Sequence, residues 1–325
     1  MVFLYVLLLL VSFVALVKGA DIFVDGSAGL AKLFNVSSVI IGLTVVALGT
    51  SMPELAVSTS AALQGSNEIA VSNVIGSNLF NLLMVLGICA VIHPVPVDKV
   101  IIRRDFPFSI VLTIVMLLAT SAASIFSGRL FSMGMEEVAG NVTRILAVFF
   151  IAIFICYIAF LIYDARKHPV EAEEIKKLPL WKCLVFIVVG LALIVAGGKL
   201  VVYSAQQIAR AFGMSETLIG LTIIAIGTSL PELVTSIVAA RKGEVALAVG
   251  NVVGSNIFNI LLILGVSSTI HPVAVVAASV YDMGILLFVS LLTLLFSVTK
   301  KSILRWEGLL MIACYVATTV FAIVR

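Results

Sequence analysis

The chain has 325 residues, of which 62% are hydrophobic and 11% charged, and its mean hydropathy is +1.25. This composition lies far outside that of soluble domains, so a water-soluble enzyme or binding protein is excluded and a polytopic membrane protein is predicted. The formal net charge of +3 says little about partners, because in a membrane protein the placement of basic residues matters more than their sum.

Apolar runs of roughly 17 to 25 residues can cross a ~30 Å hydrocarbon core as helices. They predict an all-α polytopic membrane protein with ten transmembrane helices. The first run has no basic lead-in and no cleavage pattern, so it is predicted as a span rather than a signal peptide. In chain order the predicted spans are 2–24, 38–63, 69–92, 108–126, 145–163, 183–203, 216–240, 245–270, 279–298 and 304–324.

Several other classes of function find no support in the sequence. No GxxxxGK[ST] loop occurs, so ATP-driven pumping is not expected. No catalytic site, cofactor or nucleic-acid partner is predicted either. The cysteines lie singly in or beside predicted spans, which indicates packing rather than a disulfide framework or a metal cluster. They are Cys89, Cys156, Cys183 and Cys314.

Two halves of the chain repeat one another. Residues 42–97 align without a gap with residues 220–275 at an offset of 178, and about 30 positions are identical. We predict a first five-helix repeat over 1–163, a linker over 164–182 and a second five-helix repeat over 183–325. Because five is odd, the second copy is inverted in the membrane. Inverted repeats are typical of secondary transporters.

The distribution of basic residues predicts the orientation. With the N-terminus outside, the loops facing the cytoplasm are far richer in lysine and arginine than the opposite loops, as the positive-inside rule requires. Both termini are therefore predicted outside, and the linker inside. The cytoplasmic set is Lys32, Lys99, Arg103, Arg104, Arg166, Lys167, Lys176, Lys177, Lys182, Arg241, Lys242, Lys300, Lys301 and Arg305, against Arg129, Arg144, Arg210 and Arg325 outside.

A proline and a glutamate occur at matched positions within two apolar spans, in GTSMPEL (residues 49–55) and GTSLPEL (residues 227–233). An ionised side chain at membrane depth costs ~2.5 to 3.5 kcal/mol, so Glu54 and Glu232 must be protonated, paired or neutralised by a cation. The stretches around the two glutamates, residues 47–62 and 225–240, contain no basic residue. The motif therefore indicates a proton or a bound metal ion.

The prolines and nearby polar residues indicate oxygen ligands. Pro53 and Pro231 lack the amide that would bond the carbonyls of Gly49 and Gly227, and such carbonyls can coordinate Na⁺ in broken helices. The two glycines are expected to permit the bend. Helical spacing places Thr50 beside Glu54 and Thr228 beside Glu232. The next span of each half adds a stripe with a spacing of four, comprising Asn73, Ser77 and Asn81 and then Asn251, Ser255 and Asn259.

Hard oxygen ligands of this kind suit Ca²⁺ and Na⁺, and no Cys or His in the set favours a softer metal. Gly76 and Gly254 are expected to allow close helix approach. His93-Pro94 and His271-Pro272 are interpreted as helix ends in preference to a proton relay. Asp98, Asp105 and Asp282 are predicted to be solvated at the membrane interfaces.

The motifs GTSMPEL with SNVIGSNLFN and GTSLPEL with GNVVGSNIFN resemble those of the cation/calcium exchanger superfamily, and the chain resembles its prokaryotic sodium/calcium exchangers. The resemblance implies a Na⁺/Ca²⁺ antiporter with Ca²⁺ between Glu54 and Glu232, assisted by Thr50 and Thr228. It implies flanking Na⁺ sites. Their ligands would be the carbonyls of Ala47 and Ala225 with Ser51, Ser77, Asn81, Ser229, Ser255 and Asn259.

One departure affects the transported ions. Asn259 stands where the potassium-dependent branch of the superfamily has aspartate, so K⁺ co-transport is not expected. The proton-coupled branch has GN-x-x-E in place of GTS-x-PE, so the sequence is more similar to the sodium-coupled branch. Exchange of three Na⁺ for one Ca²⁺ is implied by the resemblance and would be electrogenic.

Two alternatives stay open at this point. One is a Ca²⁺/H⁺ antiporter that uses the same glutamates as proton carriers, and the other is a passive channel or a non-transporting scaffold. The expected partners are Ca²⁺, Na⁺ and the lipid bilayer, with the chain acting as a monomer. A prokaryotic cell membrane is the expected location, because the linker is too short to form a folded regulatory domain.

Overall fold

A computed structural model describes residues 2–64, 68–169, 178–214 and 225–325. Within these ranges eight helices are long and apolar enough to cross a membrane, and the bent pair Ser38–Thr50 and Met52–Leu63 provides a ninth. The prediction of an all-α polytopic membrane protein is confirmed. Predicted span 216–240 begins in residues outside the described ranges, so the count of ten stays a prediction. Parts of the linker and of the second motif, 170–177 and 220–224, also lie outside them.

The chain forms two compact units, and each combines sequence from both predicted repeats. Unit 1 contains Met1–Pro53 and Ile162–Val252, and unit 2 contains Glu54–Leu161 and Val253–Arg325. Three helices, α4 (Met52–Leu63), α8 (Arg144–Lys167) and α13 (Val245–Phe258), pass from one unit into the other. The other elements of unit 1 are α1 (Val2–Phe34), α2 (Ser38–Ile41), η1 (Gly42–Val46), α3 (Ala47–Thr50), α9 (Leu180–Ala211), α11 (Ala225–Gly227) and α12 (Leu230–Arg241).

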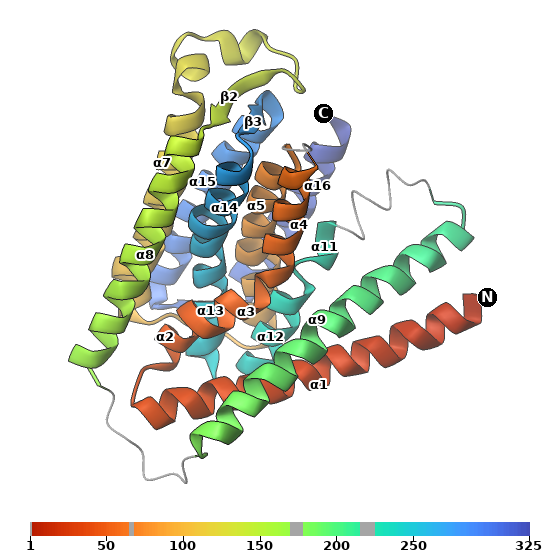
Figure 1. The fold of residues 1–325 in the computed structure, drawn as a ribbon, viewed down its shortest axis with the longest axis vertical. Helices are drawn as coiled ribbons and strands as arrows, with labels where there is room; N and C mark the ends of the chain where they lie inside the picture. Colours follow the sequence, from red (N-terminus) through yellow and green to blue (C-terminus); the bar gives the residue numbers. More distant parts are fainter. Residues whose placement is uncertain (1, 65–67, 170–177, 215–224) are drawn as a thin grey trace. The chain divides into compact units, whose positions relative to one another are not determined.

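Unit 1 is built around the side-by-side pair α1 and α9 (Figure 1). Glycine allows this close packing. A Cβ atom at Gly19 would lie 2.9 Å from the Gly190 carbonyl oxygen, and one at Gly197 would lie 2.9 Å from the Leu16 amide nitrogen. Gly19 and Gly197 are 178 residues apart, the same offset as in the two sequence motifs. At 33 and 32 residues, both helices are longer than predicted and span about 50 Å.

A charged contact joins the end of α12 to α1. Lys242 Nζ lies 2.7 Å from Asp21 Oδ1 and 2.6 Å from Asp25 Oδ1. Burial alone would lower the pKa of Lys242, but its hydrogen bonds with Asp21 and Asp25 raise this pKa above its ordinary value. The two aspartates therefore favour the charged form of this lysine at the end of the helix.

Unit 2 places its most buried spans at the centre, with α7 and α16 packed around them. The buried spans are α5 with η2 and α6, and α13 with η6 and α14. The elements of unit 2, apart from the shared helices, are α5 (Glu68–Phe80), η2 (Asn81–Val85), α6 (Leu86–Ile92), β1 (Val95–Pro96), η3 (Ile101–Asp105), α7 (Phe106–Phe126), η4 (Arg129–Ser132), β2 (Val138–Val142), η6 (Asn259–Ile263), α14 (Leu264–Ile270), β3 (Val273–Val276), α15 (Ala277–Lys300), β4 (Ser302–Ile303) and α16 (Arg305–Val324).

Short antiparallel ladders connect loops of unit 2. Val95 pairs with Ile303, while β2 lies beside β3 with Val142 opposite Val273 (Figure 1). His93 and His271 are the C-cap residues of α6 and α14 just before these loops, which agrees with their interpretation as helix ends.

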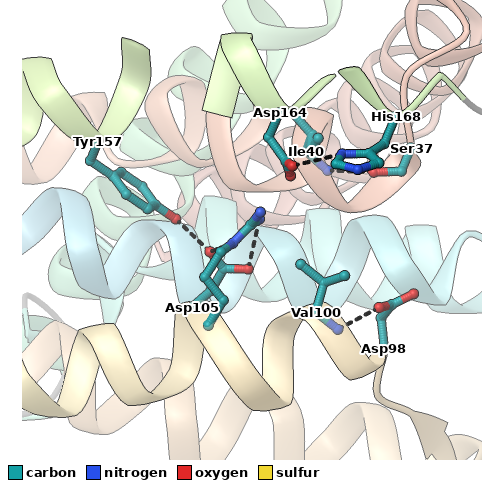
Figure 2. A network of polar contacts seen from close by, with 9 residues as sticks. Ser37, Ile40, Asp98, Val100, Asp105, Tyr157, Asp164 and His168 are labelled. Atoms are coloured by element: carbon teal, nitrogen blue, oxygen red, sulfur yellow. Dashed lines mark hydrogen bonds and ion pairs between the residues drawn. The ribbon is translucent and has the colours of Figure 1, made fainter. Parts of the chain in front are cut away.

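The prediction that Asp105 is solvated is wrong. Its side chain is fully buried in unit 2, where Arg104 binds both carboxylate oxygens at 2.9 and 3.1 Å. The hydroxyl of Tyr157 on α8 donates to Oδ1 at 3.2 Å, and Figure 2 shows Tyr157 pointing at Asp105. Asp98 is exposed as expected, and its carboxylate accepts the Val100 amide (Figure 2).

Candidate cation site

Glu232 is the acidic residue of unit 1 that sequence reasoning singled out. It lies in the first turn of α12 and is 0% exposed. Ser51 donates its hydroxyl hydrogen to Glu232 Oε1 at 3.0 Å, whereas Oε2 has no hydrogen-bond partner among the described residues. None of the ion pairs in the described ranges includes Glu232. A buried carboxylate oxygen in this setting is available to a cation.

The predicted helix break is present, but not at the glycine. Gly49 lies inside α3, and the 47° bend falls at Ser51, between α3 and α4. Pro53 explains this position because it cannot donate to the turn behind it and its ring crowds that turn. A Cβ at Gly49 would lie 3.1 Å from the Phe23 ring, so this glycine serves helix packing instead of the bend.

Just before the bend, the last residue of α3 contacts α13. Thr50 is fully buried, and its hydroxyl lies 3.0 Å from Asn251 Oδ1. Asn251 in turn donates to Ser236 Oγ at 3.0 Å. The Ala47 carbonyl accepts the Ser51 amide at 3.0 Å and lies 3.5 Å from Thr50 Oγ1.

Glu54 has a similar setting in unit 2 and is also 0% exposed. Ser77 donates to Glu54 Oε1 at 3.4 Å, and Asn73 donates to the Glu54 carbonyl at 3.4 Å. Asn73 also donates to Ser58 Oγ at 2.9 Å, which repeats the Asn251–Ser236 contact at the offset of 178. A serine hydroxyl therefore lies at each carboxylate, from the break between α3 and α4 for Glu232 and from α5 for Glu54.

The remaining predicted ligands of unit 2 present oxygens without donors. Asn81, Ser255 and Asn259 are buried, and Asn81 Oδ1, Asn259 Oδ1 and Ser255 Oγ have no hydrogen-bond partner in the described part of the chain. Buried acceptors of this kind are costly when left unpaired. Hard neutral oxygens of this kind suit Ca²⁺ and Na⁺.

The second copy of the motif is less completely described. Ser229 is buried and Thr228 is half-buried in the turn before α12, whereas Ala225 begins the short helix α11. Of the glycines expected to allow close helix approach, Gly76 would meet nothing within 4 Å on gaining a Cβ. That prediction is wrong for Gly76, since its side of α5 has room.

Sequence reasoning missed four residues that hold the predicted ligands. Ser58 and Ser236 accept from Asn73 and Asn251, while Asn78 and Asn256 contact Asn259 and Asn81. The signal was available, because both pairs carry the same residue type at the offset of 178. The residues selected from the sequence were others spaced by four on the same spans, and these four residues are not among them.

Comparison with known proteins decides the family. Residues 4–163 and 182–324 match the family described as sodium/calcium exchanger protein. The chain belongs to this family. Family membership makes it a membrane antiporter and not an enzyme, as the sequence predicted.

Individual relatives match nearly the whole chain. CaxA of Alkalimonas amylolytica is 39% identical over 319 residues, covering 94% of this chain and 95% of that protein. The sodium/calcium exchanger MaX1 of Methanosarcina acetivorans is 33% identical over 351 residues, covering 96% of both. Among solved structures, the sodium-calcium exchanger NCX_Mj soaked with 2.5 mM Na⁺ and 10 mM Sr²⁺ has a TM-score of 0.82 at 32% identity, covering 98% of this chain and 99% of that one.

Proposed function

We propose that this exchanger family member trades Na⁺ for Ca²⁺ across a prokaryotic cell membrane by alternating access. The main support for this proposal is the matched pair of fully buried glutamates, Glu54 and Glu232, each with a serine hydroxyl at its carboxylate. Relatives named as sodium/calcium exchangers support the choice of ions. Ten helices in two inverted repeats, both termini outside and a monomeric state belong to the same proposal.

In this proposal the two glutamates hold Ca²⁺ together with Thr50 and Thr228. The flanking Na⁺ ions take neutral oxygens from the remaining set. The alanine members of this set act through their carbonyl groups. The set comprises Ala47, Ala225, Ser51, Ser229, Ser77, Ser255, Asn81 and Asn259.

Charge balance makes the exchange electrogenic. With both glutamates ionised, one Ca²⁺ leaves the two carboxylates neutral, whereas three Na⁺ leave an excess of one positive charge. Each net charge that crosses the membrane is worth ~2.3 kcal/mol per 100 mV. An inside-negative potential therefore favours Ca²⁺ extrusion, and Ca²⁺ uptake into liposomes should change with an imposed potential.

Flux measurements in liposomes test the proposal. Protein in Na⁺-filled liposomes is diluted into Na⁺-free buffer with radioactive Ca²⁺, and uptake is compared with that driven by an imposed H⁺ gradient. We expect Na⁺-driven uptake at fixed pH. We also expect Glu54→Gln and Glu232→Gln to reduce it to background, because each removes one of the two charges that neutralise Ca²⁺.

Glu136→Gln serves as the matched control, since Glu136 is exposed and belongs to neither the Glu54 nor the Glu232 contacts described above. Uptake driven only by the H⁺ gradient would replace the proposal with a Ca²⁺/H⁺ antiporter. Uptake without any counter-ion gradient would indicate a channel. Wild-type rates in both glutamine variants would remove Glu54 and Glu232 from the site.

A further inference from the structure

Four asparagines interlock in unit 2. Asn78 Nδ2 donates to the Asn256 carbonyl at 3.3 Å, and Asn256 Nδ2 donates to the Asn78 carbonyl at 3.4 Å. Asn259 Nδ2 donates to Asn78 Oδ1 at 2.9 Å, and Asn81 Nδ2 donates to Asn256 Oδ1 at 3.2 Å. All four side chains are buried, at 0 to 2% exposure.

The chemistry of these contacts fixes the orientation of every amide. A main-chain carbonyl oxygen can only accept, so the atoms of Asn78 and Asn256 that face the two carbonyls must be their NH₂ groups. Their side-chain oxygens then point the other way and accept from Asn259 and Asn81. Those two residues must present NH₂ to the network, and their own oxygens face away from it.

The orientation of these amides decides which atoms of Asn81 and Asn259 have no partner in the network. Asn81 Oδ1 and Asn259 Oδ1 have no hydrogen-bond partner among the described residues. A flipped amide would place an NH₂ donor where each oxygen now lies, and a donor repels a cation. The π-helical turns η2 and η6 begin at these same two residues, and π-turns in helices are frequent at functional sites.

We propose that Asn78 and Asn256 are positioning residues that lock the amide oxygens of Asn259 and Asn81, respectively, toward the transported cation. The inference rests on the proposed function, since it assigns both oxygens to the cation sites. Each positioning residue acts on the other half of the chain. Asn78 of the first half orients Asn259 of the second, and Asn256 of the second half orients Asn81 of the first. The pair thereby sets the affinity for the cation without touching it.

A double-mutant cycle tests this crossed pattern, with half-saturating Na⁺ and Ca²⁺ concentrations as the readout. Asn78→Leu removes the acceptor and should raise the half-saturating concentration roughly ten-fold, as expected for one buried hydrogen bond lost from an oriented ligand. In an Asn259→Ala background the same change should have less than about a two-fold effect, because the oriented group is gone. In an Asn81→Ala background the ten-fold effect should persist.

The opposite pattern is expected for Asn256→Leu, whose effect should vanish with Asn81→Ala and persist with Asn259→Ala. A merely structural role would weaken binding equally in both backgrounds, and that result overturns the proposal. Asn141→Leu, at an exposed asparagine of β2, is the matched control. If a leucine variant does not fold, Asn78→Ala and Asn256→Ala carry the cycle.

Cation-induced stabilisation against heat, measured in detergent, provides a readout that does not require transport. If Na⁺ and Ca²⁺ stabilise the protein but no Na⁺-driven flux is found, the proposed function fails while the cycle still decides the positioning roles. If the crossed pattern is missing and Na⁺-driven flux is intact, only the positioning roles fail.

Discussion

Two of the buried carboxylates in the described part of the chain, Asp105 and Glu232, differ in their partners. Asp105 has the guanidinium of Arg104 and the hydroxyl of Tyr157, and Arg104 also lies over the Phe160 ring at 5.3 Å. Glu232 has a serine hydroxyl and one oxygen without a partner in the described ranges. A carboxylate with an internal counter-charge is a structural group, whereas one that lacks it is suited to binding an external cation.

Changing Asp105 or one of its partners should therefore lower the stability of the protein and leave its ion affinity unchanged. We expect Tyr157→Phe to lower the free energy of unfolding by about 1.5 kcal/mol, the value of a hydrogen bond to a charged group. Asp105→Asn should cost more, roughly 3 kcal/mol, because it leaves a partly buried guanidinium without its counter-charge. Thermal unfolding in detergent measures both, and a tenfold change in half-saturating Ca²⁺ in Tyr157→Phe would contradict this assignment.

The glutamates and the serine and asparagine stripe could be predicted because repetition at a fixed offset singled them out. Asp105 could not be placed correctly, because the sequence does not show that Tyr157 on another helix reaches it. Asn78 and Asn256 repeat at the same offset, so the residues could have been singled out, but their proposed positioning role could not. Their role depends on main-chain carbonyls of the opposite half, and carbonyl positions have no sequence signature.

At the scale of elements, glycine decides how closely α1 and α9 approach. We expect Gly197→Ala to lower the free energy of unfolding by about 1 to 3 kcal/mol, since its Cβ would enter the Leu16 backbone and overpack the contact. Gly284→Ala in α15 is the matched control, because an added Cβ there meets nothing within 4 Å. The control should be neutral or stabilising, as alanine is the better helix former. Equal melting temperatures for the two variants would contradict close packing at Gly197.

Helix positions were predictable from hydropathy, whereas several ends were not. Apolar length marks where a helix can cross the hydrocarbon core, and it does not show where the helix stops beyond it. α1 continues to Phe34 past the predicted end at residue 24, and Asp25, just beyond that end, binds Lys242 together with Asp21. The strands β1 to β4 were not predicted either, because two to five residues are too short for a periodic pattern.

For the whole molecule, the charge distribution makes a prediction about sidedness. In a variant without native cysteines, Arg129→Cys should react from outside the cell with an impermeant maleimide, and His168→Cys should not. Both positions are exposed, so accessibility within the protein does not bias the comparison. A permeant maleimide should label both. Labelling of His168→Cys alone from outside would reverse the predicted orientation.

The interleaving of the two sequence halves has a consequence for the history of the chain. α1 from the first half packs through Gly19 against α9 from the second, and Asn78 is paired with Asn256 in the same crosswise manner. A polypeptide consisting of a single half would leave these surfaces uncovered, and it could bury them only against another copy of itself. Under the proposed inverted repeat, an ancestral chain of one half would have covered these surfaces by pairing with an oppositely oriented copy of itself.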